Sequence, residues 1–215
     1  YFSSRIAVQD QPPAPLAKSE SLRDTLKNYA ALLRKNPAFV SFASKRFVYF
    51  SAVALSLPIM PLYLVREVQA TDSDIGMVSM AMNLVMLAGY YLWPRVSNRH
   101  GGRVVLLATT FGMILHPALT ASTTHVELII LFAGIAGFFQ GGLDLVFFDE
   151  LMKTVPVEYS ATFVSLAQSI QYLSMILAPL LGTWLAGFVG LSGALWVSAV
   201  IRLLGFLLFL KKDVR

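Results

Sequence analysis

The side chains that could do chemistry in this sequence lie inside long apolar stretches. Asp144 follows Gln140 by one helical turn, and Arg202 lies at a similar depth in the last stretch. A carboxylate in apolar surroundings can titrate when it is desolvated, so Asp144 could bind a proton or a cation. It could equally pair with Arg202, or Arg202 could simply extend toward the nearer surface. We predict that Asp144 and Arg202 form an ion-coupling site or a charge pair.

Three amides are the other candidates. Asn83 lies near the middle of the second apolar stretch, and Gln168 and Gln171 lie three residues apart in the fifth. Residues three apart share one face of a helix. Polar groups in apolar spans are retained mainly where they face a cavity or a partner. These amides are therefore candidate functional residues. The alternative is interhelical hydrogen bonding, which contributes about 0.6–2 kcal/mol per contact.

Six long apolar stretches must position these side chains. A bilayer core of about 30 Å requires about 20 mainly apolar residues per helix. The qualifying stretches are residues 47–65, 75–94, 104–122, 126–148, 161–187 and 191–210. They lack the alternation of strands and are too long for them. With 56% hydrophobic and 13% charged residues, the composition also excludes an ordinary water-soluble enzyme. We predict an all-α polytopic membrane protein with six transmembrane helices.

The basic residues sort onto one side of these stretches. The segment before the first stretch ends with Lys45 and Arg46, and further basic residues follow the second, fourth and sixth stretches. The opposite segments carry Arg66 as their one Lys or Arg residue. The positive-inside rule then places both termini in the cytoplasm, as an even number of spans also requires. Orientation and lipid contacts explain the net charge of +5, so we expect no nucleic-acid partner. We expect the protein to lie in a bacterial cytoplasmic membrane.

The amino-terminal segment differs in kind from the rest. A proline-rich stretch over residues 10–15 precedes a capping box at Ser21 and Asp24, which predicts a basic amphipathic helix that Asn36-Pro37 ends. We predict three regions, namely a cytoplasmic linker with a surface helix, a six-helix transmembrane bundle and a cytoplasmic tail, over residues 1–44, 45–210 and 211–215. Because the chain begins with Tyr1 rather than Met, we expect a fragment or a processed product.

A basic, glycine-containing segment between the second and third stretches carries the most specific motif. It resembles the G-x-L-x-D-R-x-G-R-R loop of the major facilitator superfamily, with matches at Arg99, Gly101 and Arg103. Asn98 replaces the usual Asp, and Pro94 replaces the first Gly. In that family the loop's charges latch neighbouring helix ends in one conformation, so the resemblance implies a conformational loop at Asn98, Arg99, Gly101 and Arg103. The alternative is a basic turn that only maintains topology.

Residues 149–161, 168–171 and 178–182 are similar to the region of helices ten and eleven in such transporters. The family fold has twelve helices in two bundles, and each bundle consists of two inverted three-helix repeats. The resemblance covers essentially the whole chain. It implies the central cytoplasmic loop followed by the carboxy-terminal six-helix half of that fold.

The resemblance also implies a function. A carboxy-terminal bundle of a secondary active transporter would move a small solute by alternating access. In that family the corresponding helices help to line the central cavity, so the resemblance implies that Asn83, Gln168 and Gln171 contact the small-molecule substrate. Its partners would be membrane lipid, the solute and an amino-terminal six-helix bundle, in the same polypeptide or a second subunit. The alternative is a non-transporting subunit or assembly factor of a larger membrane complex. The sequence has no cysteine and no zinc or nucleophile motif, so we expect no enzyme activity, cofactor or metal site.

Overall fold

The computed structural model describes residues 33–155 and 159–211, and every regular element among them is a helix. The chain divides into two units, residues 1–37 and 38–215. In the first unit, residues 33–35 are helical and this helix ends before Asn36, where the sequence predicts an end. The rest of the predicted amphipathic helix, the proline-rich stretch and the last four residues of the tail lie outside the described residues.

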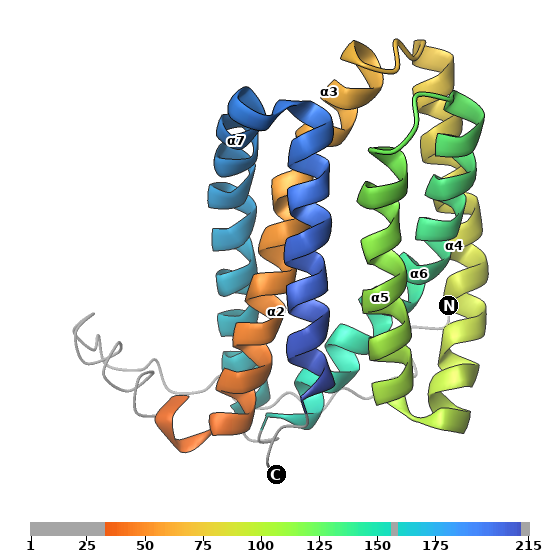
Figure 1. Cartoon of the computed structure of the whole chain (residues 1–215). Helices are drawn as coiled ribbons and strands as arrows, with labels where there is room; N and C mark the ends of the chain where they lie inside the picture. Colours follow the sequence, from red (N-terminus) through yellow and green to blue (C-terminus); the bar gives the residue numbers. More distant parts are fainter. Residues whose placement is uncertain (1–32, 156–158, 212–215) are drawn as a thin grey trace, which may run out of the picture. The chain divides into compact units, whose positions relative to one another are not determined.

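Six helical spans make up the second unit. They are formed by α2 (Pro37–Ser56) with α3 (Ile59–Arg66), by α4 (Asp72–His100), α5 (Gly102–Thr120) and α6 (Val126–Lys153), and by the two arms of α7 (Ser160–Leu210). Gly190 separates residues 160–189, the first arm, from residues 191–210, the second arm. Its φ of 76° reverses the chain there (Figure 1). The prediction of an all-α protein with six membrane-spanning helices is confirmed.

Helix ends follow from local chemistry. Thr71 caps α4, because its hydroxyl accepts a hydrogen bond from the backbone N–H of Asp74 at 3.3 Å. The Asp74 carboxylate in turn accepts a hydrogen bond from the Thr71 backbone N–H at 2.8 Å. Pro58 has no N–H to donate, and the break between α2 and α3 lies at this residue. Gly101, at a φ of 88°, is the one non-helical residue between α4 and α5.

Several helices extend beyond the predicted apolar stretches. The polar loop expected over residues 95–103 is helical except at Gly101, and α2 begins at Pro37 instead of near Phe47. The reason is that a hydropathy window detects only the most apolar part of a span. Arg95 and Arg99 continue α4 readily, and apolar residues such as Phe39 and Phe42 begin α2 before that window. At about 1.5 Å per residue, the 29-residue α4 is about 44 Å long and exceeds the roughly 30 Å bilayer core.

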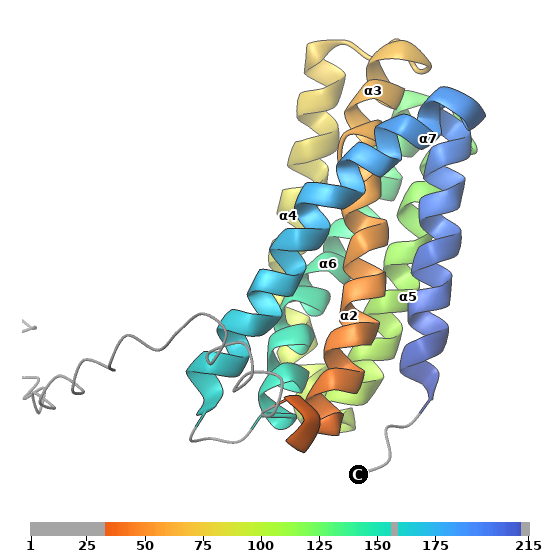
Figure 2. The same cartoon turned by 90° about the vertical axis from the view of Figure 1, so that its left-hand side faces the viewer.

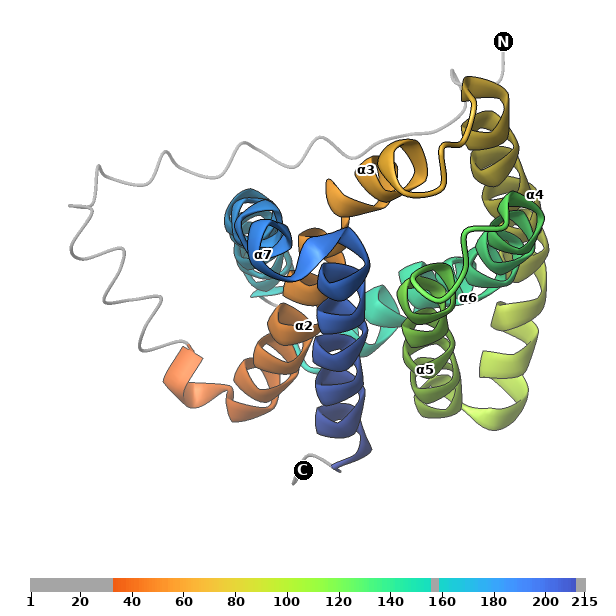
Figure 3. The same ribbon diagram turned by 45° about the horizontal axis from the view of Figure 1, so that its top comes forward.

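Glycines allow two close helix contacts. A Cβ atom on Gly141 of α6 would lie 2.8 Å from the Met86 carbonyl oxygen of α4. Likewise, a Cβ atom on Gly182 of the first arm would clash with the Leu55 carbonyl oxygen of α2. The middle helix of each three-helix half thus packs on the first helix of the other half. Figures 2 and 3 show the first arm against α2, and α4 against α6. Two inverted repeats are expected to pair in this way.

The third helices of the two halves, α5 and the second arm, pack on each other. Ser192 donates to the Ala121 carbonyl at 3.0 Å, and at the opposite end Arg103 donates to the Leu210 carbonyl at 2.9 Å. We call these ends of the bundle the Gly190 end and the Gly101 end, after the glycines at which the chain turns. The packing leaves a cavity between the two ends of the bundle, and several polar side chains of the spans line it.

Candidate functional site

A cavity of about 640 Å³ is lined by residues from all six spans. Its apolar wall includes four methionines, Met60, Met82, Met113 and Met175. Its polar lining consists of seven side chains, Ser56, Ser79, His116, Gln140, Asp144, Gln171 and Arg202. Ligand sites commonly combine a mostly apolar wall with a few polar groups that fix orientation. This cavity is the candidate site.

Arg202 is the most deeply buried charged side chain that lines the cavity, with 3% of its surface exposed. Its Nη1 donates to the Met113 carbonyl of α5 at 2.9 Å, and its Nη2 donates to the Ser56 hydroxyl of α2 at 2.8 Å. Its buried Nε has no hydrogen-bond partner. Arg202 therefore connects three helices, and its Nε nitrogen is left without a partner.

Asp144 lies on the α6 wall of the same cavity but does not pair with Arg202. Its Oδ1 accepts from Gln140 at 2.6 Å, and its Oδ2 accepts from the Tyr90 hydroxyl at 2.9 Å. The predicted charge pair is therefore not formed in this structure. Equal depth along the spans did not place the two groups together, because Arg202 bonds to α2 and α5 whereas Asp144 bonds to α4 and α6.

The three predicted amides are placed differently. Gln171 lines the cavity, whereas Gln168 is half-buried and lies outside the cavity lining. Asn83 is exposed on α4, where Ser79 and Met82 line the cavity instead. The three amides therefore do not converge, and only the placement of Gln171 supports the predicted substrate contact.

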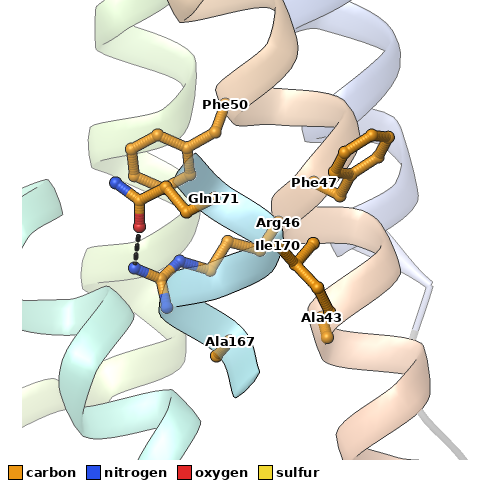
Figure 4. A pocket seen from close by; sticks show the side chains of 7 residues that line it. All are labelled: Ala43, Arg46, Phe47, Phe50, Ala167, Ile170 and Gln171. Carbon is orange, nitrogen blue, oxygen red and sulfur yellow. Dashed lines mark hydrogen bonds between the residues drawn. The ribbon is translucent and has the colours of Figure 1, made fainter. Parts of the chain in front are cut away.

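Arg46 is a site residue that sequence reasoning missed. It was assigned to the basic segment before the first span, but α2 begins at Pro37 and carries Arg46 into the bundle with 9% of its surface exposed. Its Nη2 donates to the Gln171 Oε1 at 2.5 Å (Figure 4), and its guanidinium lies 5.2 Å from the ring centre of Phe50. The apolar residues before Arg46, including Phe39 and Phe42, were the available signal for an earlier helix start.

The predicted conformational loop lies at the Gly101 end. Asn98 and Arg99 are exposed in the last turn of α4, and Gly101 makes the turn. Arg103 reaches across to the last carbonyls of the second arm, those of Phe209 at 3.5 Å and Leu210 at 2.9 Å. A cation is favourable at a helix carboxyl end, so Arg103 joins two helix ends. Control of a conformational state by these four residues stays a prediction.

These features define a class, an all-helical membrane protein whose six spans line a partly polar cavity. The family model described as Major Facilitator Superfamily matches residues 43–215. Because the match covers most of the sequence, the chain belongs to this superfamily of membrane transporters. Comparison with curated proteins gives no match.

Proposed function

We propose that this chain is the carboxy-terminal bundle of a secondary active transporter, which moves a small solute across the membrane by alternating access. The observation that carries the proposal is the cavity of about 640 Å³, lined by seven polar side chains amid six apolar spans. Polar groups within membrane spans are costly and usually face a cavity or a solute pathway. An amino-terminal bundle would supply the remaining wall of the pathway.

The arrangement of charge supports an orientation. Arg95, Arg99 and Arg103 lie near the Gly101 end, together with Lys153 and Lys211. Lys and Arg are enriched in cytoplasmic segments. We therefore propose that the Gly101 end faces the cytoplasm, that both termini lie there, and that the membrane is a bacterial cytoplasmic membrane.

Two cavity residues are proposed to act on the solute or the coupling ion. Gln171 would contact the solute through its amide. Asp144, held by the Gln140 amide and the Tyr90 hydroxyl, would bind the coupling proton or cation.

The test is solute uptake by the full transporter reconstituted in proteoliposomes. Tritiated amino acids, sugars and carboxylic acids would be offered with and without an imposed proton gradient. We expect uptake of one solute class, a fall of about tenfold or more in Asp144→Asn and a raised KM in Gln171→Ala. Ser169→Ala is the matched control, because the exposed Ser169 bonds to its own helix at the Ser165 carbonyl.

The opposite result would support the second function. Absence of uptake, together with stable co-purification in a larger membrane assembly, would favour a non-transporting subunit or assembly factor. The observation in its favour is Asn98, which replaces the family's usual Asp with an uncharged side chain in the conformational loop.

A further inference from the structure

Two buried arginines at the cavity, Arg46 and Arg202, form no ion pair with any residue that the structure describes. Arg202 lines it and Arg46 contacts the cavity residue Gln171, whereas Asp144 is the one carboxylate in the lining. Asp144 is engaged by a hydroxyl and an amide rather than by a cation. Among the described residues, ion pairs join Lys153 to Asp149 and Glu150, and neither buried arginine takes part in one. A buried cation without a counter-charge is strongly disfavoured, so an anion entering here would be stabilised.

The geometry also aligns hydrogen-bond donors. A guanidinium can only donate, so Arg46 fixes the oxygen of the Gln171 amide toward itself. Figure 4 shows the amide nitrogen turned away from Arg46, and no hydrogen bond among the described residues uses this nitrogen as donor. The buried Nε of Arg202 is likewise without a partner. Arg202 and Gln171 both line the cavity, and the Gln171 amide nitrogen is a donor for an acceptor-rich group there.

The remaining wall defines the other part of the ligand. Four methionines and Phe50 line the cavity, and methionine side chains adapt to apolar groups of varied shape. We propose that the transported solute is a small organic anion with an apolar body. Its anionic group would use Arg202 as counter-charge and Gln171 as donor, with Arg46 as a positioning residue. This inference rests on the proposed transport function and names the substrate class of the same cavity.

The test compares three probes with one aromatic body and different charge, namely benzoate, benzamide and benzylammonium. Binding to the full transporter is measured by titration calorimetry in a neutral detergent. The detergent dilutes anionic lipid headgroups, which could otherwise occupy the same anion site. We expect benzoate to bind at least about tenfold more tightly than either other probe. Equal binding of the three probes, no binding at all, or a preference for benzylammonium would overturn the proposal.

Variants test whether Arg202 causes the preference for benzoate over benzamide. Arg202→Gln should weaken benzoate binding about tenfold or more and leave benzamide within about twofold, while Arg202→Lys should retain part of the preference. Arg95→Gln is the matched control, because it removes one positive charge from an exposed side chain. The Arg95 guanidinium carbon lies 3.6 Å from the centre of the Tyr91 ring. Retained benzamide binding shows that a variant is folded. Equal effects of Arg202→Gln and Arg95→Gln would contradict the proposed site.

The positioning role of Arg46 has its own readout. Arg46→Met frees the Gln171 amide to turn, so the ratio of benzoate to benzamide affinity should fall, and Arg46→Lys should restore it partly. A general structural defect would lower both affinities and leave the ratio unchanged. Benzoate binding without uptake would contradict the transport function alone, and uptake of benzylammonium in place of benzoate would contradict the anion inference alone.

Discussion

Arg202 and Arg103 both connect α5 to the second arm of α7, but in opposite surroundings. Arg103 is exposed and donates to carbonyls at the end of the second arm, which have no partner within the helix. Arg202 is 3% exposed and donates to the Met113 carbonyl in the middle of α5. The exposed contact fastens helix ends at little desolvation cost. The buried contact requires a reason for keeping a charge in the spans, and the cavity provides one.

The largest expected effect separates these two arginines. Arg202→Gln should lower uptake by the full transporter about 10- to 100-fold, because it removes a buried charge and charge-assisted hydrogen bonds. Arg103→Gln should lower uptake less than about threefold. Both rates are measured in proteoliposomes and normalised to the amount of folded protein. The comparison fails if Arg103→Gln is the more damaging change.

A smaller effect is expected from the partner of Arg202. Ser56→Ala removes the hydroxyl that accepts from Arg202 Nη2 and leaves the bond to the Met113 carbonyl in place. Uptake should fall about 3- to 10-fold, because one hydrogen bond to the guanidinium is lost while the bond to the Met113 carbonyl still holds it in place. Ser122→Ala is the control, because Ser122 is exposed and bonds to its own helix. Equal uptake by the two variants would show that the position of Arg202 is not important for uptake.

The smallest effect is expected for the ion pairs at the Gly101 end. Lys153 contacts Asp149 and Glu150 at 2.7 Å, but 52% of its side chain is exposed. Exposed ion pairs contribute about 0–1 kcal/mol, so Lys153→Gln should lower the free energy of unfolding by less than about 1 kcal/mol. Raised salt should reduce even that difference. The measurement is denaturant unfolding in detergent at two salt concentrations. A larger and salt-independent loss would show that the Gly101 end is as dependent on charge as the cavity.

The number and order of the spans could be predicted from the sequence, because long apolar stretches have few stable alternatives in a bilayer. The ends of the helices could not. Arg95 and Arg99 continue α4 past its apolar part, so the segment before Gly101 is helical. Apolar residues such as Phe39 begin α2 early, so Arg46 lies inside the bundle rather than before it. The sequence indicated Arg46 only as a charge that sets orientation.

The site was predictable only in part, for a geometric reason. Hydropathy gives the depth of a residue in the membrane but not the direction in which its side chain points. An ion-coupling site or a charge pair was predicted for Asp144 and Arg202 from their depth, and in the structure the two side chains bond to different helices. By their spacing, Gln168 and Gln171 share one helix face, but only Gln171 lines the cavity. Contacts between helices decide these directions.

The most direct test of the central claim is access to the cavity from each side of the membrane. The chain contains no cysteine, so Ser79→Cys provides a unique thiol in this bundle on the cavity wall, and Thr109→Cys provides a fully buried control. A membrane-impermeant methanethiosulfonate reagent is applied separately from each side of sealed proteoliposomes that contain the full transporter, cleared of any other cysteines. We predict labelling of Ser79→Cys from both sides, slowed by the transported solute, and no labelling of Thr109→Cys. Labelling of Ser79→Cys from one side only, or from neither, would contradict alternating access through this cavity.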